Sequence, residues 1–143
     1  MPKPLNSRAS GAAPGKTGTT VLVVEDEDGL RCVIRRVLQD EGYTVLEAHN
    51  GVSALELLAD RAGREVSLVL TDLRMPIMDG RQLAAALARL QPSLPIVFMS
   101  GFTAQLMDMR LVSPHFAFLP KPFQNDVLLA TVRDRLDRSS LRD

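Results

Sequence analysis

The chain has 143 residues, of which 45% are hydrophobic, and this length suits one domain with a buried core. Lysine plus arginine equals aspartate plus glutamate at 17 each, so no net charge favours nucleic acid or an anionic membrane as a partner. The single cysteine excludes an internal disulfide, and no apolar run approaches the roughly 20 residues that cross a bilayer, so we expect a cytoplasmic protein without membrane insertion.

The first 19 residues contain a near-match to a phosphate-binding loop. Residues 10–17 read SGAAPGKT, one residue away from the pattern G-x-x-x-x-G-K-[ST], because Ser10 stands where the first glycine belongs. Such a loop leaves a buried strand and opens a helix, whereas here a strand-like run follows the motif. We therefore interpret residues 1–19, which are rich in proline and glycine, as a flexible leader or linker.

From residue 20 onward, short apolar runs alternate five times with amphipathic stretches. The apolar runs are 21–24, 43–46, 66–70, 96–99 and 116–119. Helical spacing of apolar residues predicts helices within 30–38, 54–62, 83–90 and 128–136, with a weaker pattern around 103–111. This alternation is typical of an α/β domain, with a parallel sheet covered by helices on both faces. We expect the domain to span 20–137, followed by a tail at 138–143.

Polar residues directly follow four of the five apolar runs. They are Glu25 with Asp26, Asp72, Ser100 and Lys121. Ligands of an open parallel sheet bind outside the carboxyl ends of its strands, where the strand order reverses. With the strand order 2-1-3-4-5, these five side chains converge at one edge of the sheet. Each alone also fits a helix cap, a turn or solvated surface, but their grouping favours a functional site.

The residue types at this edge indicate a chemistry. Carboxylates about 4 Å apart repel one another by about 4 kcal/mol per pair at an effective dielectric constant near 20, so a cation is expected among them. A few carboxylates with space for water and phosphate suit Mg²⁺ better than Ca²⁺, and no cluster of histidine and cysteine indicates zinc. A metal, a central carboxylate at Asp72, a hydroxyl and a lysine describe phosphoryl transfer to a carboxylate nucleophile.

With these residues at these positions, the sequence resembles the receiver domain of bacterial response regulators, the phosphorylated proteins of two-component signalling. The matching segments are VLVVEDED at 21–28, LTDLRMPIMDG at 70–80, IVFMSGF at 96–102 and FAFLPKPF at 116–123. The resemblance implies a flavodoxin-like, doubly wound (βα)5 fold. The segments MSG and FLPKPF are most similar to those of receivers at the C-termini of hybrid histidine kinases and of their stand-alone relatives.

The resemblance implies a role for each residue at the predicted edge. Asp72 would accept a phosphoryl group from a phosphohistidine on a sensor histidine kinase or a histidine phosphotransfer protein. Asp26 would bind Mg²⁺ directly, Glu25 mainly through water, and Arg74 through its backbone carbonyl. Lys121 would pair with Asp72 and then with the phosphoryl oxygens, aimed by a cis peptide bond to the proline that follows it.

The resemblance also implies a switch. Ser100 would move to bond the phosphoryl group, and the ring of Phe118 would then turn inward. A downstream target protein would bind the surface formed by 103–111, the strand 116–119 and the final helix, while the kinase would dock near the helix 30–38. A change of charge at one carboxylate would thereby bias a two-state surface.

Several positions depart from the commonest family pattern. Glu25 and Ser100 replace an aspartate and a threonine, and Phe118 lacks the hydroxyl of a tyrosine. Arg74 and Phe102 occupy the variable positions where the family tunes dephosphorylation. We expect a bulky Phe102 to obstruct the attacking water and to lengthen the phosphorylated state.

Other functions are compatible with parts of the sequence. An aspartate-nucleophile phosphatase carries an acid/base aspartate two residues after the nucleophile, where Arg74 stands here. A pseudo-receiver would bind partners without phosphorylation. Since seven residues follow Leu136, we expect a single-domain regulator without a DNA-binding output, and the alternative is the isolated receiver of a hybrid histidine kinase. In either case the domain would not be an ordinary enzyme, because it would catalyse only its own phosphorylation and dephosphorylation.

Overall fold

The computed structural model describes residues 18–60, 65–101 and 116–142, with side chains as far as 138. The expected leader over residues 1–17, the weaker helix around 103–111 and the tuning residue Phe102 lie outside the described residues. The strands are β1 (Thr20–Val24), β2 (Thr44–Ala48), β3 (Val66–Asp72), β4 (Ile96–Ser100) and β5 (Ala117–Pro120). The described helices are α2 (Asp28–Asp40), α3 (Gly51–Ala59), α4 (Gly80–Leu90) and α6 (Asn125–Arg142).

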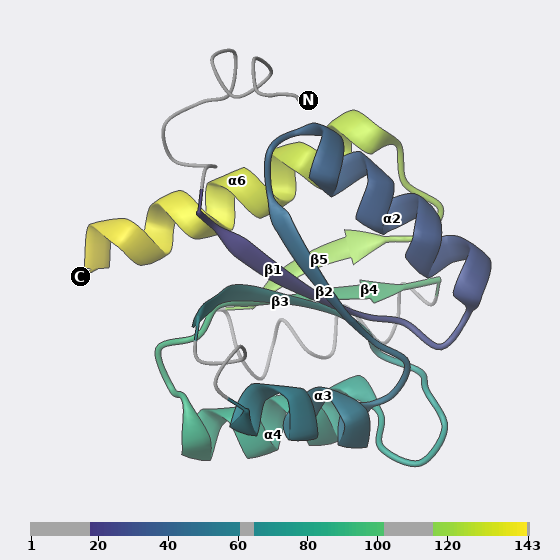
Figure 1. The fold of residues 1–143 in the computed structure, drawn as a ribbon, viewed down its shortest axis with the longest axis vertical. Coiled ribbons are helices and arrows are strands. Elements are labelled where there is room, and N and C mark those ends of the chain that lie inside the picture. Colours follow the sequence, from purple (N-terminus) through teal and green to yellow (C-terminus); the bar gives the residue numbers. More distant parts are fainter. Residues whose placement is uncertain (1–17, 61–64, 102–115, 143) are drawn as a thin grey trace.

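The five strands form one parallel sheet in the order β2-β1-β3-β4-β5, which confirms the predicted topology. Figure 1 shows α2 and α6 covering one face of this sheet and α3 and α4 covering the other. Because side chains alternate between the faces along each strand, the sheet separates two apolar cores. Leu22, Val69 and Phe98 belong to the core under α3 and α4, whereas Val23 and Leu70 belong to the core under α2 and α6.

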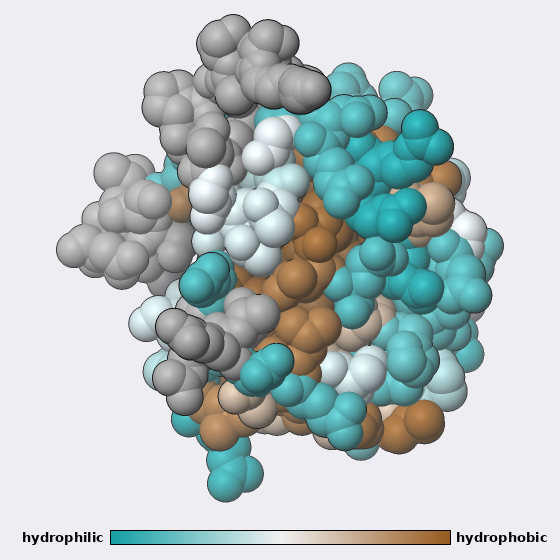
Figure 2. All heavy atoms as spheres, viewed as in Figure 1, coloured by the Kyte–Doolittle hydropathy of each residue, from teal (hydrophilic) through white to brown (hydrophobic). Residues whose placement is uncertain are grey.

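β2 lies at the edge of the sheet, next to β1, and is less buried than β3, the other neighbour of β1. Its side chains from Thr44 to Glu47 are exposed or partly buried, while β1 is buried throughout. In Figure 2, which has the same view as Figure 1, a band of apolar surface crosses the middle of the molecule where β2 runs in Figure 1. Val45 and Leu46 are partly buried β2 residues that pack against the two different cores.

The strand ends differ slightly from the apolar runs of the sequence. β3 extends through Asp72, which the pattern placed after the strand, because Asp72 pairs in register with Met99 of β4. β2 begins one residue later than its apolar run, since the Tyr43 backbone N–H donates to Leu38 at the end of α2 rather than to a strand. Asp72 is therefore held by the sheet itself and not by a loop.

The segment between β3 and α4 is fixed by backbone hydrogen bonds directly behind Asp72. The Leu73 N–H donates to Met99 at 2.9 Å, and the Gly80 N–H donates to Leu73 at 2.9 Å. Asp79 and Gln82 form a capping box at the start of α4. The helix begins so close to the strand that a Cβ atom on Gly80 would overlap the backbone oxygen of Asp72.

Ile77, in the same segment, has a backbone conformation that is unusual for its type. Its φ angle is 71°, and the Met78 N–H donates across it to the Pro76 carbonyl at 2.7 Å, which makes a γ-turn of the rare, strained kind. β-branched residues are genuine outliers at positive φ. The Ile77 side chain is 78% exposed, so little burial compensates the backbone strain.

Gly80→Ala is expected to lower the free energy of unfolding by about 2 kcal/mol, because the new methyl group meets rigid backbone rather than a movable side chain. Gly29→Ala is the matched control, since nothing lies within 4 Å of a Cβ at this position in the first turn of α2. The control should be neutral or more stable than the wild type. Urea unfolding of the three proteins measures the effect, and equal losses in both variants would contradict the overlap.

Ile77→Asn is expected to raise the free energy of unfolding by about 1 kcal/mol, because asparagine tolerates positive φ better than a β-branched residue does. Ile77→Val keeps the branched Cβ and serves as the control that should show no gain. Thermal or urea unfolding checks both variants. A valine variant as stabilised as the asparagine variant would mean that loss of exposed apolar surface, not backbone relief, causes the effect.

Candidate functional site

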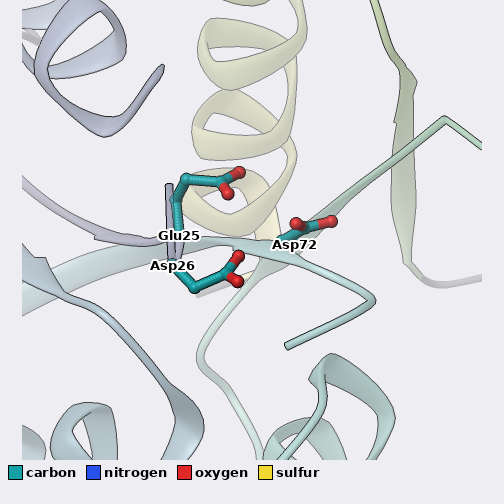
Figure 3. Close-up of side chains that lie close together, drawn as sticks. All are labelled: Glu25, Asp26 and Asp72. Atoms are coloured by element: carbon teal, nitrogen blue, oxygen red, sulfur yellow. The ribbon is translucent and has the colours of Figure 1, made fainter. Parts of the chain in front are cut away.

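Three carboxylates meet at the carboxyl edge of the two central strands. Glu25 and Asp26 follow β1, and Asp72 ends β3, its neighbour in the sheet. One carboxylate oxygen from each residue lies within 4.8 Å of the other two. Figure 3 shows Glu25 and Asp26 leaving the end of β1 together and extending their carboxylates toward the side on which Asp72 lies. The structure thus brings together the three acidic residues that the sequence predicts for one site.

The three carboxylates differ in their access to solvent. Glu25 is 1% exposed and Asp72 is 7% exposed, whereas Asp26 is exposed. Burial raises the pKa of the Glu25 carboxyl above its usual value, the hydrogen bond from Lys121 opposes this, and the charge of Asp72 raises the pKa further. Buried charges of the same sign are costly unless a cation accompanies them.

Lys121, which follows the edge strand β5, supplies a cation to this cluster. Its Nζ donates to Glu25 Oε1 at 2.9 Å and to Asp72 Oδ2 at 3.1 Å. Burial alone would lower the pKa of Lys121, but its hydrogen bonds and the charges of Glu25 and Asp72 raise it above the usual value. The lysine is therefore charged when it bridges the two buried carboxylates.

The backbone next to β5 aims this lysine. The Lys121 N–H donates to the Ser100 carbonyl at 2.8 Å, and the peptide bond between Lys121 and Pro122 is cis, as the sequence predicts. Ser100 ends β4 and is 2% exposed, one residue beyond Met99, the register partner of Asp72. The polar residues that end β3 and β4 and follow β5 therefore lie along one edge of the sheet.

The acidic cluster has the composition of a metal site. Three carboxylates face one ammonium, which leaves an excess of negative charge, and oxygen ligands suit a hard divalent cation. A pocket of about 410 Å³ adjoins the cluster at Asp26 and offers space for water and for a further ligand. Its lining consists of Asp26, Leu73, Arg74, Met75, Pro76, Asp79 and Arg81. The residues present therefore fit a bound metal ion.

The remaining predicted residues lie around this centre. Arg74 lines the pocket together with Asp26. Phe118, in the middle of β5, is partly buried and stacks on Phe98 with ring centroids 5.9 Å apart and an interplanar angle of 26°. Phe116 contacts the same ring edge-on at a centroid distance of 4.9 Å. Phe118 thus packs into the core under α3 and α4 rather than against the carboxylates.

Two contacts that basic side chains make at the site were not predicted from the sequence. The sequence paired Lys121 with Asp72, whereas the structure also gives it a hydrogen bond to Glu25, which no spacing along the chain reveals. Arg31 in α2 donates to the Glu25 backbone carbonyl at 2.8 Å. An arginine one turn into the helix that follows an acidic pair is the signal that would have indicated this second contact.

Comparison with known proteins identifies the family of this chain. Residues 21–133 match the profile of the response regulator receiver domain. The sensor kinase CckA of Brucella abortus (strain 2308) is 42% identical over 120 residues, which cover 83% of this chain and 13% of the relative. The response regulator receiver protein CpdR of the same organism is 38% identical over 104 residues, which cover 72% of this chain and 84% of the relative. The transcriptional regulatory protein GlrR of Escherichia coli (strain K12) is matched over only 27% of its length.

Solved structures show the same likeness. The receiver domain of the hybrid histidine kinase CckA is 34% identical with a TM-score of 0.69, over 82% of this chain and 98% of that one. A CheY-like receiver from Methanospirillum hungatei JF-1 has a TM-score of 0.78 at 22% identity, over 87% and 98% of the two chains, and supports the fold. None of the described helices is long and apolar enough to span a bilayer. The chain belongs to the response regulator receiver domains, the signalling domains of two-component systems.

Proposed function

We propose that this receiver accepts a phosphoryl group on Asp72, in a reaction that depends on Mg²⁺ and takes the group from a phosphohistidine of a partner protein. The observation that carries the proposal is the bridge from Lys121 to Asp72 and Glu25, at 3.1 and 2.9 Å, beside a carboxylate triad whose oxygens lie within 4.8 Å of one another. This arrangement gathers a carboxylate, a cation and possible metal ligands beside a pocket that Asp26 lines.

The proposed transfer is a single displacement at phosphorus. An Asp72 carboxylate oxygen forms the new P–O bond while the P–N bond to the partner's imidazole breaks, and the bonding pair leaves with that nitrogen. The second ring nitrogen carries the proton, so the histidine departs neutral. Asp26, Asp72 and the Arg74 carbonyl would hold Mg²⁺, with Glu25 acting through water, and the bound ion would supply positive charge for the phosphoryl oxygens. Lys121 exchanges its contact with Asp72 for one with a phosphoryl oxygen.

We propose that phosphorylation of Asp72 changes the conformation of a surface that lies away from Asp72. Ser100 would bond the new phosphoryl group, and the main-chain hydrogen bond from Lys121 to Ser100 links that movement to β5. Phe118, on β5, is only partly buried and would then turn further inward, so that one arrangement of the segment 102–115, β5 and α6 gains contacts that the other lacks. We propose this surface as the site for a downstream target, with Arg74 and Phe102 setting how long the phosphoryl group lasts.

The proposed donor is a sensor histidine kinase or a histidine phosphotransfer protein, which would dock beside the exposed side of α2. The relatives include both a sensor kinase with a receiver and a receiver protein of similar length to this chain. The same chemistry at Asp72 serves a single-domain regulator and a hybrid-kinase receiver. We assign the receiver to 20–137 and treat binding without phosphorylation, as in a pseudo-receiver, as the competing function.

Incubation with Mg²⁺ and acetyl phosphate is expected to add the mass of one phosphoryl group to the wild-type protein and none to Asp72→Ala. EDTA should abolish the gain, because the metal ligands would then lack their cation. Asp40→Ala, which removes an exposed carboxylate at the far end of α2, is the matched control and should be phosphorylated normally. Intact-mass spectrometry measures the adduct.

Two results of this experiment would contradict the proposal. A phosphoryl group on Asp72→Ala would place the acceptor on another residue. No adduct on the wild type, under conditions that phosphorylate a known receiver, would favour the pseudo-receiver function.

Lys121→Met is expected to lower the free energy of unfolding by about 2 kcal/mol without Mg²⁺, because it leaves buried Glu25 and Asp72 without their cation. Saturating Mg²⁺ should recover part of this loss. Arg133→Met is the control, since the Arg133–Glu41 ion pair is exposed and contributes less than about 1 kcal/mol. Urea unfolding with and without Mg²⁺ tests both variants, and a Lys121→Met protein as stable as the wild type would refute the bridge.

A further inference from the structure

The turn that carries Glu25 and Asp26 leads into a helix that lacks the usual cap. Glu27 is the N-cap residue of α2, and its side chain makes no capping hydrogen bond. By contrast, Asn50 and Asp79 cap α3 and α4 with complete capping boxes. Without a cap, the first turn of α2 needs another means of fixing the peptide groups that precede it.

Arg31 provides this means from inside the helix. Its Nη1 donates to the Glu25 backbone carbonyl at 2.8 Å, its Nη2 donates to Asp28 Oδ1 at 2.7 Å, and its Nε donates to Glu47 Oε1 at 3.2 Å. The planar guanidinium thus connects the end of β1, the first turn of α2 and the edge strand β2. Its side chain is only 18% exposed, so solvent competes weakly for these donors.

The contact with the Glu25 carbonyl bears directly on the acidic cluster. That oxygen belongs to the planar peptide group that joins Glu25 to Asp26. The Glu25 N–H is also fixed, since it donates to the Ala48 carbonyl of β2 at 3.1 Å. The Glu27 N–H donates to Glu25 Oε2 at 3.1 Å and holds the Glu25 side chain itself. With both peptide groups of Glu25 also held, β2 and Arg31 help to set the direction in which the Glu25 and Asp26 side chains leave the backbone.

The charge of Arg31 is balanced locally and adds little field at the cluster. Asp28 and Glu47 accept from Arg31, and Glu47 also pairs with Arg35 at 3.4 Å. Two arginines and two carboxylates therefore form a neutral group beside the site. The influence of Arg31 on a bound cation is then geometric, through the peptide group, rather than repulsive.

We infer that Arg31 is a positioning residue for metal binding, which orients the Glu25–Asp26 peptide without touching the metal. The inference rests on the proposed Mg²⁺ site and adds a residue to it. Partners that orient metal ligands from outside typically change metal affinity by about 10–100-fold when removed. Arg31 acts on the backbone between two ligands, so the lower end of this range applies.

Arg31→Met is expected to raise the Mg²⁺ dissociation constant about tenfold. Amide NMR titration of the unphosphorylated protein with MgCl₂ measures the constant independently of phosphorylation. Arg35→Met is the matched control, because it removes a contact with the same Glu47 but none with Glu25. The control should lose a similar amount of stability in urea and keep the wild-type dissociation constant.

Arg31→Gln is the second variant, since its shorter amide keeps a polar group in the helix but cannot join all three partners. Far-UV circular dichroism establishes which variants are folded. A folded Arg31→Met or Arg31→Gln protein with the wild-type constant would overturn the inference, as would an equal loss of affinity in Arg35→Met. Absence of saturable Mg²⁺ binding by the wild type would instead refute the proposed metal site.

Discussion

The ammonium of Lys121 holds together two buried carboxylates from distant parts of the chain. Glu25 follows β1 and lies 96 positions before Lys121, and Asp72 ends β3. Without a cation there, Glu25 and Asp72 would face each other as like charges in a poorly solvated site. The bridge connects the edge strand β5 with the central strands β1 and β3. A change of charge at Asp72, as the proposed phosphorylation would cause, would therefore act through Lys121 on the segment that follows β5.

The site depends on two kinds of contact with different purposes. Lys121 contacts carboxylate oxygens and balances charge, whereas Arg31 contacts a backbone carbonyl and fixes direction. Next to Asp72, the Gly80 N–H donates to the Leu73 carbonyl, and α4 begins close against the backbone of Asp72, so the end of β3 is also fixed. Together these contacts hold the three carboxylates close to one another and to Lys121, as the proposed metal site requires.

Much of this arrangement follows from the sequence. The alternation of apolar runs and amphipathic stretches predicts the parallel sheet, because buried strands and surface helices have different hydrophobic periods. The positions of Glu25, Asp26, Asp72 and Lys121 after those runs predict that they meet, since parallel strands end at the same edge. The order of the strands then selects which residues become neighbours. Even the extension of β3 through Asp72 changes the predicted strand end by only two residues.

Other contacts depend on distances that no spacing encodes. Lys121 reaches Glu25 as well as Asp72 because the strand order places the segment after β5 within reach of both carboxylates. Ile77 has positive φ although its side chain favours negative values, because the chain between β3 and α4 must close a turn there. The pairing of Glu47 with Arg31 and Arg35 likewise requires the register of β2 against β1. Glu47 also bears on the edge of the sheet. Among the described strands β2 is an edge strand with an apolar band beside it, and a charged side chain on such a strand disfavours the addition of another chain to the sheet.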